Sequence, residues 1–224
     1  MMQPYPVFLI DLDRRRCVVI GGDHEAERKT RELLEVGARP VVIADEVDPG
    51  LAELARDGRI DHTPRQYRDG DLRGAFLVIA SGQPEARNRA IRREAHGEGA
   101  ICNVMDVPEL CDFVAGSVVR RGPLTVSIST AGCGPALAVR LREQLQQLLT
   151  PAHGRLLELM AGLRERVKAR HPSFAERKRR WFALVDSDVL EQLSAGREAE
   201  ALQQMEQILD LPSKALRSEG PAPL

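Results

Sequence analysis

The sequence contains no long hydrophobic run and no export signal. A membrane-spanning helix needs about 20 mostly apolar residues in succession, and no stretch of this chain comes near that length. The amino-terminal segment also lacks a charged stretch followed by an apolar one, the pattern of a secretory signal peptide. We therefore expect a cytoplasmic protein without a membrane anchor.

The sequence also lacks paired cysteines and a large net charge. The four cysteines, Cys17, Cys102, Cys111 and Cys133, form no C-x-x-C pair, which argues against a zinc site and against a disulfide framework. No cluster of cysteine, histidine and carboxylate residues suggests another metal site. The 32 Lys and Arg residues nearly balance the 33 Asp and Glu residues, for a net charge of −1. Bulk charge thus gives no reason to expect a nucleic acid or a membrane surface as partner.

The stretch from Cys17 to Lys29 carries the strongest functional signal. Four apolar residues run into Gly21 and Gly22, and the charged residues that follow favour a helix. A strand, a glycine turn and a helix are typical of a dinucleotide-binding unit, because the helix N-terminus attracts a pyrophosphate. Gly21 and Ala26 fit the fingerprint G-x-G-x-x-G/A, but Asp23 replaces its middle glycine. Either the Asp23 carboxylate points away from the pyrophosphate, or cofactor binding is weak.

The segments around this turn predict a Rossmann-like, doubly wound α/β domain over residues 1–114. The hydrophobic pattern predicts strands at residues 5–10, 17–20, 40–44, 60–63, 75–80 and 101–104, and helices at residues 24–36, 48–56 and 84–96. The run from Ala75 to Ala80 is continuously apolar, as expected of a parallel strand that is covered on both faces.

Candidate functional residues stand at the ends of these strands. Asp45 and Glu46 follow the second strand of the βαβ unit, where an acid binds the adenosine ribose and repels the extra phosphate of NADP, so we expect NAD. The alternative is a solvated acid that starts the next helix. Ser81 ends the apolar run, where a cofactor can approach. Asp106 follows the strand at 101–104 and can accept a proton at the mouth of the crevice, or it is an ordinary turn residue.

The chain changes character after residue 115. Ser117–Arg121 and Leu124–Ser129 predict a β-hairpin, and Pro135 opens an amphipathic helix. This much apolar surface suggests a subunit interface. We therefore expect a dimerisation region at residues 115–150, a helical domain at 151–211 and a flexible tail at 212–224.

The predicted helical domain includes a locally basic stretch. Nine Arg or Lys residues and only three Glu residues lie between His153 and Trp181. The stretch can receive a polyanion, or it can be the solvated face of a helix that buries its leucines.

Taken together, these motifs resemble the precorrin-2 dehydrogenase and sirohydrochlorin ferrochelatase family, which includes the N-terminal half of multifunctional siroheme synthases. The likeness rests on Pro6-Val7-Phe8, Val19-Ile20-Gly21-Gly22, Ala26-Glu27-Arg28-Lys29, Leu33-Leu34-Glu35-Val36-Gly37-Ala38, Cys102-Asn103-Val104-Met105-Asp106-Val107-Pro108, Phe113 and Gly122-Pro123-Leu124-Thr125-Val126-Ser127-Ile128-Ser129. These motifs follow in the same order and spacing along roughly residues 4 to 182.

The resemblance implies a homodimer with an NAD-binding Rossmann domain, a central dimerisation region and a helical region. It implies NAD-dependent oxidation of precorrin-2 to sirohydrochlorin and, in bifunctional members, insertion of ferrous iron to give siroheme. By matching positions, Asp106 falls on the family's essential aspartate, and His24, Glu25, Asp45 and Glu46 fall on its NAD contacts.

The implied substrate is a tetrapyrrole that carries several carboxylates. Arg120 and Arg121 are candidates to bind them, and Asn103 and Thr130 are further candidates for substrate binding. The same carboxylate, Asp106, can serve both steps, because dehydrogenation and metal insertion each release protons.

The chain departs from the family pattern at two places. The family usually has a glycine at the position of Asp23, which bears on cofactor affinity and hence on the dehydrogenase step. The loop after the hairpin is usually Ser-Ser-Gly-Gly-Thr-Ser-Pro, whereas this chain keeps a hydroxyl at Thr130 and loses two at Cys133 and Gly134. Two alternatives therefore stay open: a non-catalytic protein that binds a tetrapyrrole or a nucleotide, and a chelatase that works without NAD.

Overall fold

A computed structural model describes residues 3–212, which divide into two compact units between Ala115 and Gly116. This division lies next to the boundary at residue 114 that the sequence predicts. Residues 213–224, which make up nearly all of the predicted tail, lie outside the described residues. No helix in the described range is long and apolar enough to cross a membrane.

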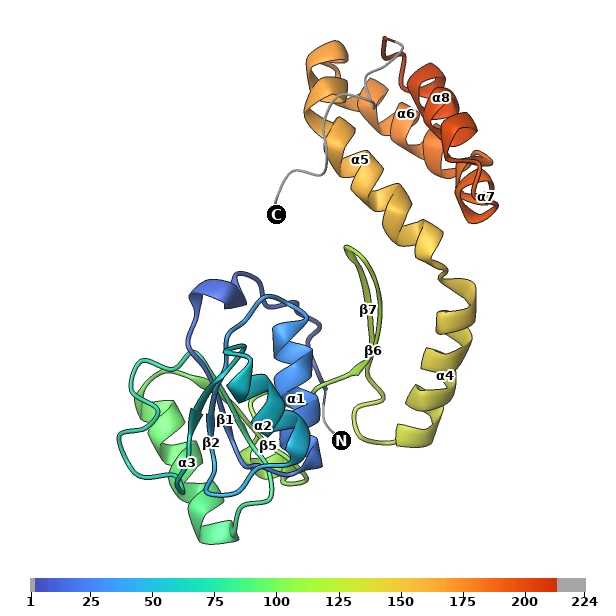
Figure 1. Cartoon of the computed structure of the whole chain (residues 1–224). Helices are drawn as coiled ribbons and strands as arrows, with labels where there is room; N and C mark the ends of the chain where they lie inside the picture. The colour runs from blue at the N-terminus through green and yellow to red at the C-terminus, as the bar shows by residue number, and fades with distance from the viewer. Residues whose placement is uncertain (1–2, 213–224) are drawn as a thin grey trace. The chain divides into compact units, whose positions relative to one another are not determined.

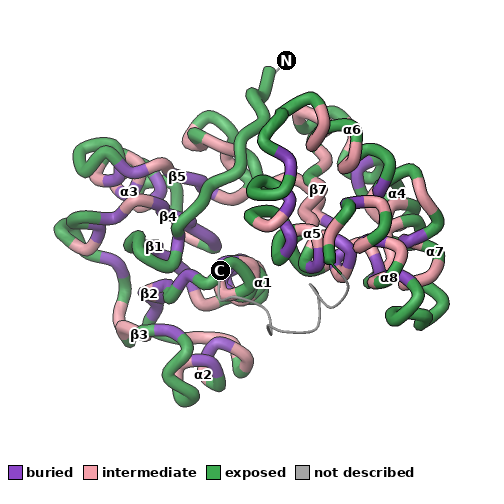
Figure 2. The backbone as a smooth tube through the Cα atoms, turned by 90° about the horizontal axis from the view of Figure 1, so that it is seen from above, coloured by how far each residue is buried: buried purple, intermediate pink, exposed green. Residues whose placement is uncertain are grey.

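The first unit, coloured from blue to green in Figure 1, is built around a five-stranded parallel sheet. The strand order is β3-β2-β1-β4-β5, as the labels in Figure 2 show. Its strands are β1 (Cys17–Ile20), β2 (Val41–Ile43), β3 (Asp61–Thr63), β4 (Leu77–Ala80) and β5 (Ile101–Val104). Its helices are α1 (His24–Leu34), α2 (Pro49–Arg56) and α3 (Glu85–Gly97), with short 3-10 helices at Leu12–Arg14 and Pro108–Leu110. The parallel α/β fold expected from the sequence is confirmed.

Helices cover both faces of this sheet. Successive residues of a strand point to opposite faces, so each strand contributes side chains to the core on both sides. Val18, Ile20 and Val78 belong to a core cluster with Ile91 of α3. Val19, Val42 and Ile79 belong to a second cluster with α1 and α2. All four residues of β1 and of β4 are buried, and buried positions gather along the central strands in Figure 2. The continuous apolar runs in the sequence thus correspond to strands that are covered on both sides.

The strand predicted at residues 5–10 does not form. The backbone there has no regular structure, and Tyr5, Val7, Phe8 and Ile10 are exposed. An apolar run becomes a strand only where another strand supplies hydrogen-bond partners. The sheet ends at β3 and β5, and among the described residues no strand pairs with this segment.

The second unit begins with the predicted hairpin. The antiparallel strands β6 (Ser117–Arg121) and β7 (Leu124–Ile128) pair with Val119 opposite Val126. The long helix α4 (Pro135–Leu148) follows and ends before Pro151, as expected of a residue that cannot continue a helix.

Four more helices complete the second unit: α5 (Pro151–Arg170), α6 (Phe174–Val185), α7 (Val189–Ser194) and α8 (Glu198–Ile208). They share a core that includes Leu163 of α5, Leu184 of α6, Val189 of α7 and Met205 of α8.

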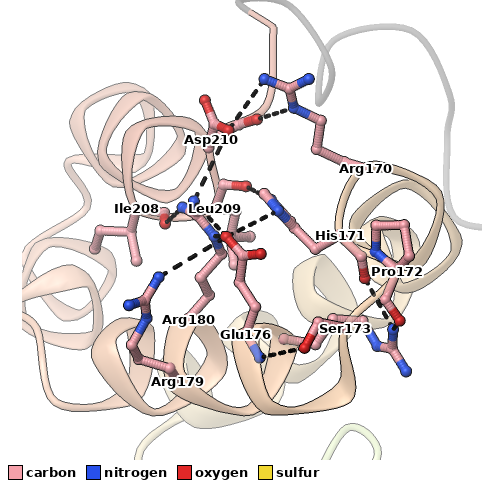
Figure 3. Close-up of polar contacts among 11 residues, drawn as sticks. Arg170, His171, Pro172, Ser173, Glu176, Arg179, Arg180, Ile208, Leu209 and Asp210 are labelled. Carbon is pink, nitrogen blue, oxygen red and sulfur yellow. Dashed lines mark hydrogen bonds and ion pairs between the residues drawn. The ribbon is translucent and has the colours of Figure 1, made fainter.

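A cluster of polar contacts around His171, Glu176 and Arg180 joins the ends of α5, α6 and α8 (Figure 3). His171, which caps α5, is 4% exposed, and its Nε2 atom donates to the carbonyl oxygen of Leu209 at 2.8 Å. Its Nδ1 atom lies 3.4 Å from the Glu176 carboxylate. Arg180 donates to the carbonyl oxygen of Ile208 at 2.8 Å and to the Glu176 carboxylate at 3.1 Å. These bonds satisfy carbonyl groups that a helix end leaves without partners.

Candidate functional site

The turn after β1 needs glycine at two positions because backbone atoms of neighbouring loops approach it closely. Gly21 has a φ of 130°, and a side chain there would begin 2.5 Å from the carbonyl oxygen of Ser81 at the end of β4. A side chain at Gly22 would overlap the carbonyl oxygen of Glu46, in the loop between β2 and α2. Both glycines therefore allow three loops to meet closely at the carboxyl edge of the sheet.

A pocket of about 440 Å³ opens at this meeting point. Strand order reverses between β1 and β4, and parallel α/β sheets bind ligands beyond the carboxyl ends of their strands at such a switch point. Six of the predicted cofactor residues line the pocket: Gly21, Gly22, Asp23, Asp45, Glu46 and Ser81.

His24 and Glu25, the other two predicted cofactor contacts, do not line the pocket. They occupy the first turn of α1, and the Glu25 carboxylate accepts hydrogen bonds from Arg28 of the same helix. The hydrogen bond from Arg28 is the largest cause that lowers the Glu25 pKa.

Asp23 caps helix α1. One carboxylate oxygen accepts a hydrogen bond from the backbone N–H of Ala26 at 2.8 Å. The Ser81 hydroxyl lies 2.9 Å from both oxygens of the same carboxylate. The carboxylate points toward the N-terminus of α1, where a pyrophosphate is expected to bind, and its effect on cofactor binding stays a prediction. It holds the helix N-terminus from within the pocket.

A chain of hydrogen bonds orients Asp45. The Gln66 amide donates to the Asp45 carboxylate at 2.9 Å, and Arg87 of α3 donates to the Gln66 carbonyl oxygen at 2.6 Å. The hydrogen bond from Gln66 is the main cause that lowers the pKa of Asp45, with a smaller contribution from the charge of Arg87. Asp45 is therefore ionised at neutral pH and held in one direction.

Gln66 and Arg87 line the pocket but were missed in the sequence. Gln66 lies in a polar loop, and Arg87 is one of several arginines along α3. No local pattern distinguishes them, because only the folded sheet brings them to Asp45.

Glu94 of α3 fixes the loop that carries Gln66. Its carboxylate accepts hydrogen bonds from the Tyr67 hydroxyl, from the backbone N–H of Gly70 at 3.0 Å and from that of Leu72 at 2.8 Å. Burial, followed by the bond to Glu94, raises the pKa of Tyr67, so the hydroxyl keeps its proton. Tyr67 itself lines the pocket, and its hydroxyl donates to Glu94, so the residue helps to hold this part of the wall in place.

Asp106 stands just beyond β5 at the same edge of the sheet. The backbone N–H of Met105 donates to the carbonyl oxygen of Ala80 at 2.9 Å, which joins the tips of β5 and β4. Asp106 has a φ of 62° in a turn closed by the bond from Val107 to Val104. Its side chain is exposed, and within residues 3–212 no hydrogen bond or ion pair engages the carboxylate. It does not line the 440 Å³ pocket.

The left-handed backbone of Asp106 is uncommon for residues other than glycine, although aspartate and asparagine adopt it more readily than most. Such conformations are often found where a side chain must be presented for function. Asn103 braces the segment that follows, because its buried amide donates to the carbonyl oxygen of Phe113 at 2.8 Å.

The other three predicted substrate residues belong to the second unit. Arg121 donates to the carbonyl oxygens of Gln146 and Leu149 at 2.9 and 2.6 Å, and so caps the end of α4. Arg120 donates to the Thr125 hydroxyl at 3.1 Å. Thr130 is partly buried, and its backbone carbonyl oxygen closes a turn by accepting from the backbone N–H of Cys133. Their assignment to substrate binding stays a prediction.

Within the described part of the chain, no group of three or more His, Cys, Asp or Glu residues is arranged to hold a metal ion. The four cysteines are free thiols.

Three family models match the chain in succession. Residues 8–117 match a family described as putative NAD(P)-binding, residues 121–148 match the central region of sirohaem biosynthesis proteins, and residues 152–209 match the sirohaem synthase dimerisation region. The last of these lies after residues 115–150, the segment for which we predicted dimerisation.

Curated relatives point the same way. The chain is 38% identical over 208 residues to the siroheme synthase of Methylobacillus flagellatus, which covers 93% of this chain and 44% of that protein. It is 37% identical over 209 residues to the siroheme synthase of Thioalkalivibrio sulfidiphilus, covering 93% and 42%. The chain therefore spans less than half the length of these relatives.

Among solved structures, SirC, a precorrin-2 dehydrogenase, matches with a TM-score of 0.71 and 22% identity. The match covers 91% of this chain and 100% of that one. At this level of identity the match establishes the shared fold.

Proposed function

We propose, from the premise that this chain belongs to the siroheme synthase family, that it is an NAD-dependent dehydrogenase that oxidises precorrin-2 to sirohydrochlorin. The observation that carries the proposal is the position of two functional elements on one sheet edge. The glycine turn with its pocket lies beyond β1 and β4, and the Asp106 carboxylate, which has no partner among residues 3–212, lies beyond β5.

The pocket has the parts that a nicotinamide dinucleotide needs. Gly21 and Gly22 let the loops after β1, β2 and β4 meet next to the first turn of α1, and Asp45 offers an oriented acceptor for ribose hydroxyls. The ionised Asp45 also disfavours a 2′-phosphate, which supports NAD over NADP. The bound cofactor would supply the acceptor for the hydride that leaves the substrate.

Asp106 is proposed as the group that takes up the proton. Oxidation of the macrocycle removes a hydride and a proton, and an exposed carboxylate without a competing partner is free to accept the latter. Asn103 and the turn from Val104 to Val107 keep the carboxylate at the strand end.

The direct test is turnover by the purified chain. We expect sirohydrochlorin absorbance to appear when precorrin-2 and NAD are both present, and no product when NAD is left out. Intact precorrin-2 after long incubation with NAD and folded protein would remove the dehydrogenase proposal.

Insertion of ferrous iron into sirohydrochlorin is a second candidate activity. The observation that favours it is again the free Asp106 carboxylate, because metal insertion releases two pyrrole protons that need an acceptor. Sirohydrochlorin supplied with ferrous or cobaltous ion, without NAD, separates this activity from the first.

The proposal also includes assembly and location. Residues 152–209 match a dimerisation region, and we propose a homodimer, which light scattering can test. The four free thiols suit a reducing compartment, and we propose a cytoplasmic location.

A further inference from the structure

The residue at the middle position of the glycine fingerprint is a carboxylate that occupies the helix N-terminus. A pyrophosphate bound by this fold approaches the backbone at that position and sits on the first N–H groups of the helix. In this chain the Asp23 carboxylate accepts the Ala26 N–H at 2.8 Å and the Ser81 hydroxyl at 2.9 Å. It takes donors that a phosphate oxygen would otherwise use.

The backbone does not explain this choice of residue. Asp23 has a φ of −79° and a ψ of 175°, an extended conformation open to any residue. Glycine is therefore not needed at position 23 for the turn itself. A glycine there serves the approach of the ligand, so the consequence of its replacement falls on ligand binding.

The charges around the pocket increase this effect. Four carboxylates line it, from Asp23, Asp45, Glu46 and Asp48, and Arg87 is the one cationic side chain in the lining. The Arg87 guanidinium donates to the side-chain oxygens of Gln66 at 2.6 Å and Gln83 at 3.0 Å, so two neutral amides engage it. A diphosphate brings two negative charges into this environment.

We propose that Asp23 is a specificity-determining residue, an internal anion that weakens binding of the diphosphate and weakens it more for ligands with additional phosphate charge. This inference rests on the proposed function, since it takes the ligand of the pocket to be a dinucleotide. The pocket accordingly favours NAD over NADP and over nucleoside triphosphates, and it holds NAD less tightly than a pocket with glycine at this position.

Two variants separate charge from shape. Asp23→Asn removes the charge and keeps a side chain that caps helices well. Asp23→Gly removes the side chain and restores the fingerprint. We expect both variants to bind NAD at least about tenfold more tightly than the wild type, which corresponds to about 1.4 kcal/mol. Calorimetric titration of the full chain with NAD measures this, and thermal unfolding shows that both variants remain folded.

Salt and a third variant complete the test. Repulsion between exposed charges is screened at high salt, so NAD binding by the wild type should strengthen between about 0.05 and 0.5 M salt relative to Asp23→Asn. Asp45→Ala should weaken NAD binding in the same assay, because it removes the ribose acceptor.

The outcomes distinguish this inference from the function beneath it. Tighter binding by Asp23→Gly alone would mean that bulk, not charge, matters, and would overturn the internal-anion proposal. Unchanged affinity in both Asp23 variants, with weaker binding in Asp45→Ala, would overturn it while leaving the NAD site in place. No NAD binding by any folded variant would overturn the proposed function together with this inference.

Discussion

The carboxyl edge of the sheet in the first unit and the helices of the second unit differ in how their charged residues are partnered. At the sheet edge of the first unit, neither Asp106 nor the four acids that line the pocket form an ion pair among the described residues. In the second unit, charged groups pair with one another. Arg155 meets Glu198 at 2.6 Å, and Arg170 meets Asp210 at 3.1 Å.

This difference changes the meaning of the basic stretch between His153 and Trp181. Its cations find carboxylates and carbonyl groups that lie far along the chain, such as Glu198, Asp210 and the carbonyl oxygen of Ile208. A run of positive residues in a sequence is thus not yet a positive surface. Leu156, Leu159, Leu163 and Val167 of this stretch are buried, and several of its cations help to hold α5, α6 and α8 together.

Asp106→Asn should have the largest effect. Asparagine tolerates the left-handed backbone at this turn, so folding and NAD affinity should not change, while turnover falls by about 100-fold or more because the proton acceptor is lost. Steady-state rates, an NAD titration and thermal unfolding measure the three quantities. Glu109→Gln, an exposed acid three residues further on, serves as the matched control and should retain full activity. Equal losses in both variants would show that general charge, and not Asp106, matters.

His171→Ala should break the polar contacts that join the ends of α5, α6 and α8. It leaves the carbonyl oxygen of Leu209 buried without its donor, at a cost of about 2 kcal/mol in the free energy of unfolding. Urea unfolding followed by helix content gives the value. Lys168→Ala, which removes an exposed ion pair with Glu165, should change stability by less than about 0.5 kcal/mol. If the free energy of unfolding of His171→Ala equals that of the wild type, these polar contacts are not important for packing.

Gln66→Ala should weaken the binding of NAD in the pocket. Removal of the amide frees the Asp45 carboxylate from its fixed direction, and we expect NAD affinity to fall by a few-fold, about the scale of one hydrogen bond. The ratio of NAD to NADP affinity should fall as well. Competition titrations with both cofactors provide the measurement, and a preserved ratio would exclude a role for Gln66 in orienting Asp45.

Acid should weaken the first unit through the ion pair of Asp71 and Arg65, although this effect is the smallest. The hydrogen bonds from Arg65, at 2.7 Å to each oxygen, lower the pKa of Asp71 below its ordinary 3.8. The pair therefore stabilises the fold fully above that value, and its contribution is lost as the pH falls through the lowered pKa. Asp71→Asn should remove this part of the pH dependence of unfolding. An identical acid profile in the variant would contradict it.

Much of the fold could be predicted because its signals are local. Apolar runs such as Cys17–Ile20 and Ile101–Val104 became strands with the predicted bounds, and the helix predicted from residue 24 begins at His24. Residues 5–10 failed because strand formation depends on a partner, which local composition does not reveal.

The candidate site, too, could be predicted only where its residues follow from local sequence. Gly21, Asp45 and Asp106 follow strands directly, and their place at the sheet edge follows from the parallel fold. Gln66, Arg87 and Glu94 act across elements separated by more than 20 residues, and their own sequence neighbourhood carries no sign of it.

The strand order also has a consequence for synthesis. β1 is first in the chain but third across the sheet, between β2 and β4. A nascent chain that has released only residues 17–63 can pair β1 on one side alone, and the other edge of Cys17–Ile20 stays open until Leu77–Ala80 emerges from the ribosome. Slowing translation between these two segments should therefore prolong exposure of an apolar strand edge and increase aggregation of the newborn protein.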